Sequence, residues 1–332
     1  MKLIVQIPCL NEEETLPQTI ADIPREIEGI DEVEILVIDD GSSDRTIEVA
    51  REAGAEHVIS FAQNRGLASA WSAGMDEALR LGADVIVNTD ADNQYRGECI
   101  RDLVQPIVRD EADMVVGARP IDDIQEFSWT KKRLQRLGSW VVRKVSDTEI
   151  SDATSGFRAY SRDAAYELAV VSRFTYTHET LIQAGRTGLA VTEVPIETNP
   201  KTRPSRLFRS IPEYIRRSVN TILRIYGLYE PLAFFNVVAG VLFILSAILG
   251  VRYVYFAAIG EGTGHVQSVI AAAVLLMLSG QSFALGMLAD LIAANRKLIQ
   301  DTRARVREMQ FSGGDTKHSS RPLQLTRRGE YP

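Results

Sequence analysis

The chain has 332 residues, of which 45% are hydrophobic, 24% charged and 7% aromatic, with 12 Pro and 23 Gly. This composition excludes a disordered, collagen-like or low-complexity chain, and the length suggests two domains of ordinary size or one domain with attachments. The two cysteines, Cys9 and Cys99, are too few for a disulfide scaffold or a thiolate zinc site.

Charge is distributed unevenly along the chain. Residues 1–200 contain 20 Lys and Arg against 36 Asp and Glu, a net charge of −16, whereas residues 201–230 and 295–332 carry +5 each. Residues 231–294 are nearly uncharged. An acidic domain, a basic collar, an uncharged stretch and a basic tail in this order are typical of a membrane-anchored protein. The acidic domain also argues against binding to nucleic acid, because it would repel phosphate backbones.

The first 120 residues predict strands and helices in alternation. Short runs rich in β-branched residues predict strands at 3–7, 34–38, 57–59, 85–88 and 114–116. The segments between them predict helices at 13–28, 44–53, 67–81 and 97–109. Asp44 suits a helix N-cap, and Gly54 and Gly82 suit helix C-terminal stops. Strict alternation predicts an α/β domain with a mostly parallel sheet, whose ligand crevice lies beyond the carboxyl ends of the strands.

A basic and then an apolar region follow this domain. Within residues 206–230 apolar residues recur at helical spacing with Arg between them, which predicts amphipathic juxtamembrane helices; a solvated basic helix packed on the domain is the alternative. Residues 232–251 and 266–289 are free of charge and long enough for a bilayer core, which needs about 20 apolar residues. We therefore predict a two-helix transmembrane hairpin over residues 231–294, rather than two helices buried in a soluble core.

The flanks of the hairpin indicate its orientation. Both are rich in Arg, whereas the loop between the two spans carries one cation, Arg252. The positive-inside rule then places the flanks and the N-terminal domain in the cytoplasm, with the protein in the cell membrane. Met1 leads directly into a strand-like run, so we expect no signal peptide. Residues 295–332 are predicted to form a basic cytoplasmic tail, partly disordered.

Polar residues follow three of the predicted strands. The first strand is followed by Asn11 and Glu12, the second by Asp39-Asp40-Gly41 and the fourth by the segment 90–94, Asp-Ala-Asp-Asn-Gln. A glycine-rich dinucleotide fingerprint and a Walker-A loop are both missing from the sequence. Carboxylates at strand ends can hold ribose hydroxyls, or a divalent cation that in turn holds phosphates.

Asp90 and Asp92 lie two residues apart, so both carboxylates point to the same side if the chain stays extended. That spacing lets them share one hard cation. An Asp-x-Asp pair alone is more often a solvated surface turn, and the functional interpretation depends on the polar residues at the neighbouring strand ends.

These motifs resemble the family 2 glycosyltransferases of the GT-A fold, especially dolichyl-phosphate mannose synthase and related polyprenyl-phosphate sugar transferases. The matching segments are residues 7–13, 38–46, 64–67, 90–94 and 117–119, followed by the Asp-x-x-Ser-Gly-Phe-Arg segment at 152–158. The resemblance implies a Rossmann-like GT-A catalytic domain over residues 1–205. The sixth position of the metal motif is Tyr95, where mannose synthases commonly have His, so the sugar pocket can differ.

The resemblance also implies roles for individual residues. It implies a nucleotide pocket lined by Pro8, Leu10, Asn11, Glu12, Asp39, Asp40, Gly41, Asp90 and Ala91. It implies that Mg²⁺ or Mn²⁺ is held by Asp90, Asp92 and Gln94, with Asp90, Asp92 and Arg119 as catalytic residues. It implies contacts with the phosphate of the acceptor or donor from Arg119, Ser139, Arg158, Arg203 and Arg206. Arg suits that task because its guanidinium binds phosphate oxygens in pairs; a merely basic membrane collar is the alternative for Arg203 and Arg206.

By this resemblance the chain is an inverting, metal-dependent hexosyltransferase. It would transfer a monosaccharide from a nucleotide sugar, UDP- or GDP-hexose, to a polyprenyl or dolichyl phosphate among the membrane lipids, for glycan or protein glycosylation. Such an acceptor is already anionic at neutral pH and needs positioning but no general base. The sequence leaves open which sugar, nucleotide and polyprenol are used, and also the oligomeric state, a homo-oligomer included.

A glycosyltransferase acting on a hydroxyl acceptor, in polysaccharide or glycolipid synthesis, is the alternative. It would need a general base. Processive synthases of the superfamily carry a catalytic Asp near a Gln-x-x-Arg-Trp motif, which this chain lacks. Glu179 is the residue that could serve as that base, with structural anchoring as its other interpretation. A non-catalytic membrane adaptor is a third hypothesis, but it gives no reason for Asp90, Asp92 and Gln94.

Overall fold

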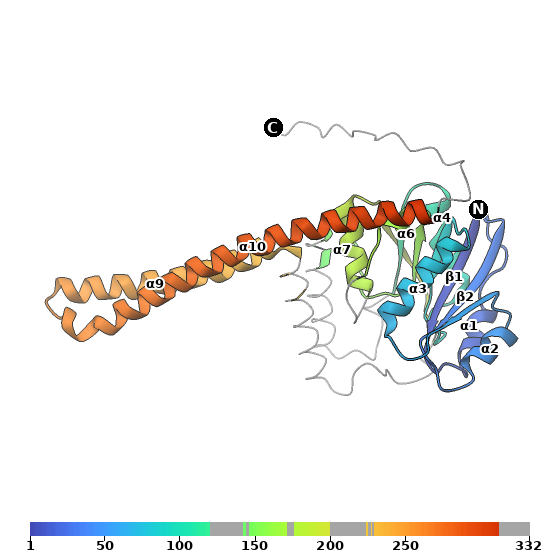
Figure 1. Cartoon of the computed structure of the whole chain (residues 1–332), viewed down its shortest axis with the longest axis horizontal. Helices are drawn as coiled ribbons and strands as arrows, with labels where there is room; N and C mark the ends of the chain where they lie inside the picture. The colour runs from blue at the N-terminus through green and yellow to red at the C-terminus, as the bar shows by residue number, and fades with distance from the viewer. Residues whose placement is uncertain are drawn as a thin grey trace.

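The protein consists of an α/β domain and a long helical hairpin that extends from it (Figure 1). The computed structural model describes residues 1–119, 142–143, 146–170, 176–199, 224, 227 and 229–311. The expected phosphate contacts Ser139, Arg203 and Arg206 lie outside the described residues, as do most of the predicted juxtamembrane helices and the chain after Phe311.

The domain is built on a seven-stranded sheet in the order β3-β2-β1-β4-β6-β5-β7. The strands are β1 (Lys2–Cys9), β2 (Glu32–Asp39), β3 (His57–Ser60), β4 (Val85–Asn88), β5 (Met114–Ala118), β6 (Arg158–Ser161) and β7 (Val191–Pro195). All neighbours pair in parallel except β6, which is antiparallel to β4 and β5. The mostly parallel sheet and its five predicted strands are confirmed, and β6 and β7 are additional.

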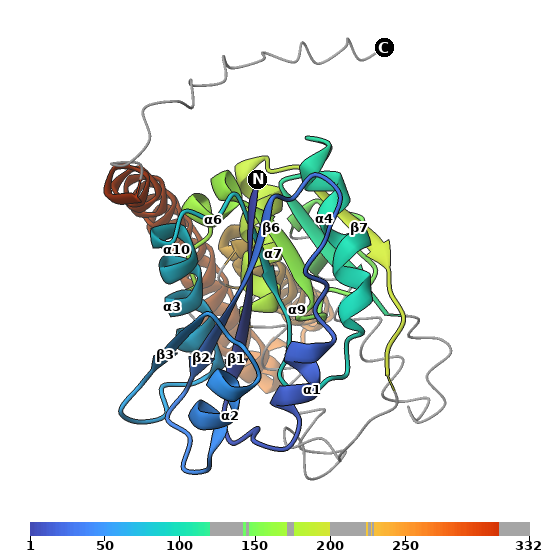
Figure 2. The ribbon, with the colours of Figure 1, turned by 90° about the vertical axis from the view of Figure 1, so that its right-hand side faces the viewer.

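Helices cover both faces of this sheet (Figure 2). They are α1 (Leu16–Ala21), α2 (Thr46–Glu52), α3 (Leu67–Arg80), η1 (Gly97–Cys99), α4 (Ile100–Val108), α6 (Arg162–Glu167) and α7 (Thr177–Thr187). The core consists of two hydrophobic clusters, one on each face of the sheet. One cluster lies between the sheet and α3, α6 and α7, and the other lies between the sheet and α1, α2 and α4. The central strands are mostly aliphatic, as expected where both faces are buried, although Gln6 of β1 and Asn88 of β4 are buried polar residues.

Two helix predictions differ from the structure. The helix predicted at 13–28 forms only as α1, because Pro24 lacks a backbone N–H and clashes with the preceding turn, so the helix ends before it. The N-cap position of α2 is Arg45 and not Asp44, although the Asp44 carboxylate accepts a hydrogen bond from the Thr46 N–H at 3.0 Å. Gly54 and Gly82 follow α2 and α3 with φ of 91° and 83°, which confirms them as helix stops.

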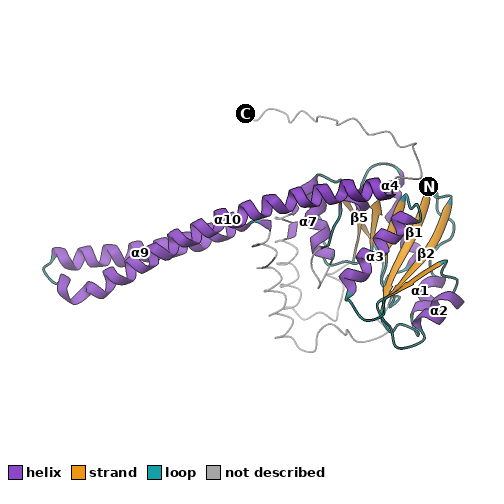
Figure 3. Ribbon diagram, viewed as in Figure 1, coloured by secondary structure: helices purple, strands orange, loops and turns teal. Residues whose placement is uncertain are grey.

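The hairpin consists of α9 (Pro231–Ala258), the short η2 (Gly262–His265) and α10 (Val266–Phe311), and no strand lies within it (Figure 3). Both long helices are long and apolar enough to cross a membrane, with mean hydropathies of 2.5 and 1.9 in their most apolar windows. Only 11% and 17% of those windows is buried within the protein, whereas a core helix of a soluble protein is mostly buried.

The two long helices pack through small residues. The Ser246 hydroxyl donates to the Ala272 carbonyl at 2.7 Å, and the Ser279 hydroxyl donates to the Ala239 carbonyl at 2.8 Å. Such residues let two membrane helices approach closely. The sequence predicted that the hairpin ends at residue 294 and that a tail follows. In the structure α10 continues past this residue to Phe311 and contacts the α/β domain.

Candidate active site

The carboxyl ends of β1, β2 and β4 meet at one edge of the sheet. β1 pairs with β2 as far as Cys9 and Asp39, and with β4 as far as Gln6 and Asn88. The segments that follow these three strands therefore leave the sheet side by side, as the sequence motifs predict.

Hydrogen bonds tie the first two of these segments together. Asn11 has a φ of 55°, a left-handed conformation that Asn tolerates better than most residues. Its N–H donates to the Ser42 hydroxyl at 2.9 Å, and its side-chain oxygen accepts from the Ser43 N–H at 2.8 Å. The Glu12 N–H donates to the Thr46 hydroxyl at 2.9 Å. The strand-end loops thus form one wall rather than two independent turns.

The carboxylates of Asp39 and Asp40 are buried and hold this wall in place. Asp39 accepts from the Ser42 N–H at 3.1 Å and from the Ser60 hydroxyl at 2.7 Å. Asp40 accepts from the N–H groups of Arg65 and Gly66, at 2.7 and 2.9 Å, just before α3 begins. Ionised carboxylate oxygens have further lone pairs, so these bonds are compatible with an additional ligand contact.

Gly41 is where the second segment meets the loop before α3. Its φ is 78°, and a Cβ there would lie 2.7 Å from the Gln63 carbonyl carbon and 2.8 Å from the Asn64 nitrogen. Only glycine allows this left-handed turn and this approach together.

Asp90 and Asp92 follow β4 at the same edge. Burial and the negative charge of Asp92 raise the pKa of Asp90 to about 7, against the opposing effect of Arg119. The Asp92 carboxylate accepts from the Gln94 N–H at 3.1 Å, and the Ala91 carbonyl accepts from the Thr19 hydroxyl at 3.1 Å. Two like charges are therefore fixed close together in a partly desolvated place, an arrangement that a cation would relieve.

The donor set fits a hard divalent cation that is shared with a ligand. Within the described ranges no group of three or more His, Cys, Asp or Glu side chains is placed to enclose a metal ion. Mg²⁺ is usually held by one or two carboxylates together with substrate phosphates and water. Asp90 and Asp92 match that pattern, and Gln94 lies two residues beyond, where its backbone carbonyl accepts from the Asn199 N–H at 2.9 Å.

Gly156 lies against the Asp90 carboxylate. A Cβ on Gly156 would lie 3.2 Å from a carboxylate oxygen of Asp90 and 2.8 Å from the Tyr176 hydroxyl. The Gly156 carbonyl accepts from the Asn88 side-chain amide at 2.9 Å and from the Tyr176 hydroxyl at 3.2 Å. Its N–H donates to the Tyr95 hydroxyl at 3.2 Å. Tyr95 is the sixth residue of the metal motif, whereas no sequence motif pointed to Asn88 or Tyr176.

Arg119 lies close enough to Asp90 to affect its pKa, but its main partner is Asp152. Its Nε donates to one carboxylate oxygen at 2.7 Å and its Nη2 to the other at 3.1 Å, with a further bond from Nη2 to the Thr154 hydroxyl at 2.9 Å. Although burial favours the neutral acid, the Arg119 charge holds the pKa of Asp152 below its usual range. Three of the five guanidinium N–H donors are accounted for by these bonds.

Arg158 does not occupy the position expected of a phosphate-binding residue. Its side chain is fully buried and donates only to atoms within the domain. The acceptors are the carbonyls of Ser155, Ala153 and Thr177, at 2.8, 2.9 and 2.6 Å, and the Thr180 hydroxyl at 2.9 Å. Arg158 therefore joins the Gly156 segment to α7 and has a structural role in place of the expected contact.

Glu179 is buried on α7. It accepts a long hydrogen bond from Gln183 at 3.5 Å, and it contributes, with burial, to raising the pKa of Tyr229 to about 12. Burial and the Arg158 charge lower the pKa of the neighbouring His178 imidazole to about 4.

Comparisons with known proteins identify the family of the chain. The family model of glycosyl transferase family 2 matches residues 4–169. The chain is 31% identical over 206 residues to the undecaprenyl-phosphate mannosyltransferase of Micrococcus luteus, covering 59% of this chain and 83% of that one. It is 31% identical over 211 residues to the dolichyl-phosphate hexose transferase of Haloferax volcanii, covering 62% and 86%.

Among solved structures, the domain is similar to glucosyl-3-phosphoglycerate synthase from Mycobacterium tuberculosis in complex with Mn²⁺, uridine diphosphate and glucosyl-3-phosphoglycerate. The TM-score is 0.52 at 21% identity, over 68% of this chain and 79% of that one. At that identity the likeness concerns the fold, which is the GT-A type of α/β domain. With the family model spanning half of its length, the chain belongs to glycosyl transferase family 2.

Proposed function

We propose that this protein transfers a monosaccharide from a nucleotide sugar, UDP- or GDP-hexose, to a polyprenyl or dolichyl phosphate. The observation that carries the proposal is the Asp90–Asp92 pair at the carboxyl edge of the sheet, in a domain joined to a hairpin able to cross a membrane. The names of the similar proteins from Micrococcus luteus and Haloferax volcanii support the choice of a lipid phosphate as acceptor.

Different residues at this edge bind the metal ion and the nucleoside. Asp90 and Asp92 would hold Mg²⁺ or Mn²⁺, with Gln94 beside them, and the ion would neutralise charge on the departing nucleoside diphosphate. The nucleoside lies against a wall formed by the segments that follow the strands. The residues of this wall are Asn11, Glu12, Asp39 and Asp40, with Pro8, Leu10, Gly41 and Ala91.

The acceptor needs no proton removed. Its phosphate oxygen attacks the anomeric carbon from the face opposite the diphosphate, so the C–O bond to the diphosphate breaks as the new C–O bond forms and the anomeric configuration inverts. Arg119, held rigidly by Asp152, supplies positive charge beside Asp90. The Arg-rich flanks of the hairpin support a cytoplasmic catalytic domain.

Transfer is tested with the purified full chain in detergent, Mn²⁺, a polyprenyl phosphate and a panel of radiolabelled nucleotide sugars. We expect acid-labile label in the organic phase from one donor, with the inverted anomeric configuration by NMR. Asp92→Asn should abolish transfer, whereas Asp102→Asn, which changes an exposed carboxylate on α4, should leave it intact. Metal-dependent nucleotide binding without transfer to any polyprenyl phosphate would reject the proposal, and Glu179→Gln would then test the hydroxyl-acceptor alternative.

A further inference from the structure

The C-terminal part of α10 leaves the apolar span and lies along the α/β domain (Figure 1). Contacts with the domain and its junction occur at two separated places on this one helix, around Arg296 and around Arg307. The basic composition of this segment predicted a tail, and the proposed reaction does not use it.

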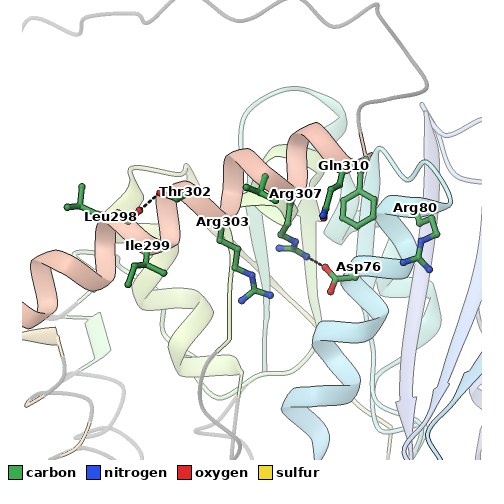
Figure 4. A pocket seen from close by; sticks show the side chains of 10 residues that line it. Asp76, Arg80, Leu298, Ile299, Thr302, Arg303, Arg307 and Gln310 are labelled. Atoms are coloured by element: carbon green, nitrogen blue, oxygen red, sulfur yellow. Dashed lines mark hydrogen bonds and ion pairs between the residues drawn. The ribbon is translucent and has the colours of Figure 1, made fainter.

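The contact far from the span is built around Arg307, whose side chain is buried. Its Nη1 donates to the carbonyls of Ala165 and Leu168, at 2.7 and 2.9 Å, at the C-terminal end of α6. The last carbonyls of a helix lack intrahelical partners, and a cation there is favourable. Its Nη2 forms an ion pair with Asp76 on α3 (Figure 4). Phe311, one turn further, packs against the hydrophobic cluster of that face.

The contact near the span is built around Tyr229, which is 7% exposed and lies just before α9. The Arg296 guanidinium of α10 lies over its ring at 4.3 Å from the centroid. The Arg186 guanidinium of α7 lies 5.8 Å from the same centroid and also forms an ion pair with Glu230. One aromatic ring thus joins α10, α7 and the start of α9.

A cleft of about 650 Å³ lies between α10 and α3, lined in part by Leu298, Ile299 and Arg303, and the Arg307–Asp76 pair forms part of its wall (Figure 4). The helix is therefore attached around Arg296 and around Arg307, and the cleft lies on the side of the helix that faces α3. Arg296 and Arg307 are eleven residues apart, or about 16 Å along a continuous helix. A helix fixed to a body at two points and continuous with a membrane span sets both the height and the tilt of that body.

We propose that residues 296–311 form a strut that holds the catalytic domain in one orientation to the bilayer, and that Arg307 is a positioning residue for a membrane-borne acceptor. The inference rests on the proposed function, because orientation matters only if one substrate is confined to the membrane surface. A lipid phosphate cannot follow a tilting domain, so a loose strut lowers the fraction of encounters in which it can reach the Asp90 edge.

The test compares Arg307→Ala with Arg305→Ala, which removes the same charge from an exposed position on the same helix. Each full-length variant is assayed with a polyprenyl phosphate in vesicles and with a short, water-soluble isoprenyl phosphate. We expect Arg307→Ala to lower kcat/KM for the vesicle acceptor by about fivefold or more, with the short acceptor and the KM for the nucleotide sugar almost unchanged. Arg305→Ala should match the wild type, and Asp76→Asn, which keeps the carbonyl contacts of Arg307, should show a smaller loss.

A second measurement does not depend on activity. A dye on Glu48→Cys, exposed on α2, in a Cys99→Ser background reports energy transfer to acceptor dyes in the lipid headgroups. We expect a narrow distribution of transfer for the wild type and Arg305→Ala, and a broad one for Arg307→Ala. Equal losses with both acceptors, or an unchanged distribution in Arg307→Ala, would overturn the strut. A broadened distribution in a protein whose wild type transfers no sugar to any polyprenyl phosphate would reject the proposed function and retain the strut.

Discussion

Gly156 lies against the Asp90 carboxylate because it has no side chain, and three side chains fix its backbone there. The residue types at the strand ends could be predicted from the sequence, since each follows an apolar run directly. Their partners could not be, because Asn88 reaches Gly156 and Tyr176 across 68 and 88 residues of chain. The resemblance implied a phosphate contact for Arg158, but its side chain is buried, and its four internal acceptors depend on the tertiary fold.

Replacing Gly156 by Ala tests whether its close approach to Asp90 is needed for catalysis. The new methyl group would lie within 3.2 Å of the Asp90 carboxylate, so either that carboxylate or the Tyr176 hydroxyl must move. We expect transfer to fall by about tenfold or more, with a loss of about 1–3 kcal/mol in the free energy of unfolding. Gly250→Ala, where a Cβ meets nothing within 4 Å, is the control. Wild-type turnover in Gly156→Ala would show that the close approach has no catalytic role.

The raised pKa of Asp90 makes metal binding depend on pH. A divalent cation binds the ionised carboxylate, and protons compete for it below a pKa of about 7. We expect Mn²⁺ affinity, measured by electron paramagnetic resonance, to rise about tenfold per pH unit up to that pKa and to level off above it. Asp90→Asn should bind weakly without this slope. An affinity that stays constant between pH 5.5 and 7 in the wild type would contradict the prediction.

The stability of the metal-free protein depends on pH in the opposite direction to the Mn²⁺ affinity. Because the folded pKa of Asp90 lies above its unfolded value of about 4, the folded state binds the proton more tightly. Its contribution is therefore fully present below pH 4 and is lost as the pH rises through about 7. Thermal unfolding in a chelator should show this loss in the wild type and not in Asp90→Asn.

Among the elements, the long and strongly patterned ones were predictable and the short ones were not. Strands β1 to β5 follow from β-branched runs with turn residues at both ends, whereas β6, four residues beginning with a buried Arg158, has no such pattern. The 46-residue α10 combines an apolar span with an Arg-rich extension of polar composition. Composition alone does not distinguish a docked helix from a solvated tail, because docking depends on Asp76 and α6 elsewhere in the fold.

Within the hairpin, helix packing makes a prediction at one glycine. Gly286 faces Phe235, and a Cβ there would lie 2.9 Å from the Phe235 Cβ. Gly286→Leu should therefore push α9 and α10 apart and lower the stability measured by detergent-induced unfolding, by about 1–3 kcal/mol. Gly280→Leu adds the same side chain to the same helix where a Cβ meets nothing within 4 Å, and it should have little effect. Equal effects of the two substitutions would indicate that the pair does not pack in this way in detergent.

At the scale of the whole molecule, the charged segments are separated from the far end of the apolar hairpin, as expected for a protein anchored in a bilayer. The acidic domain and the Arg-rich extension of α10 lie at one end of the hairpin, and η2 lies at the other (Figure 3). Because both chain segments that flank the hairpin emerge at the same end, a hairpin that crosses a membrane would leave the domain and the extension on one side of it. The direct contact of Arg307 with α6 requires the same arrangement.

The side they share follows from the positive-inside rule and can be measured in cells. Thr263→Cys places a thiol in η2, and Glu48→Cys places one on α2, both in a Cys99→Ser background with Cys9 buried. With the Arg-rich flanks inside, a membrane-impermeant maleimide should label Thr263→Cys in intact cells, and Glu48→Cys only after permeabilisation. The reverse pattern would place the Asp90 edge outside the cell, away from cytoplasmic nucleotide sugars. If neither thiol were labelled until the cells were permeabilised, the hairpin would not cross the membrane, and the acceptor would have to be sought in solution.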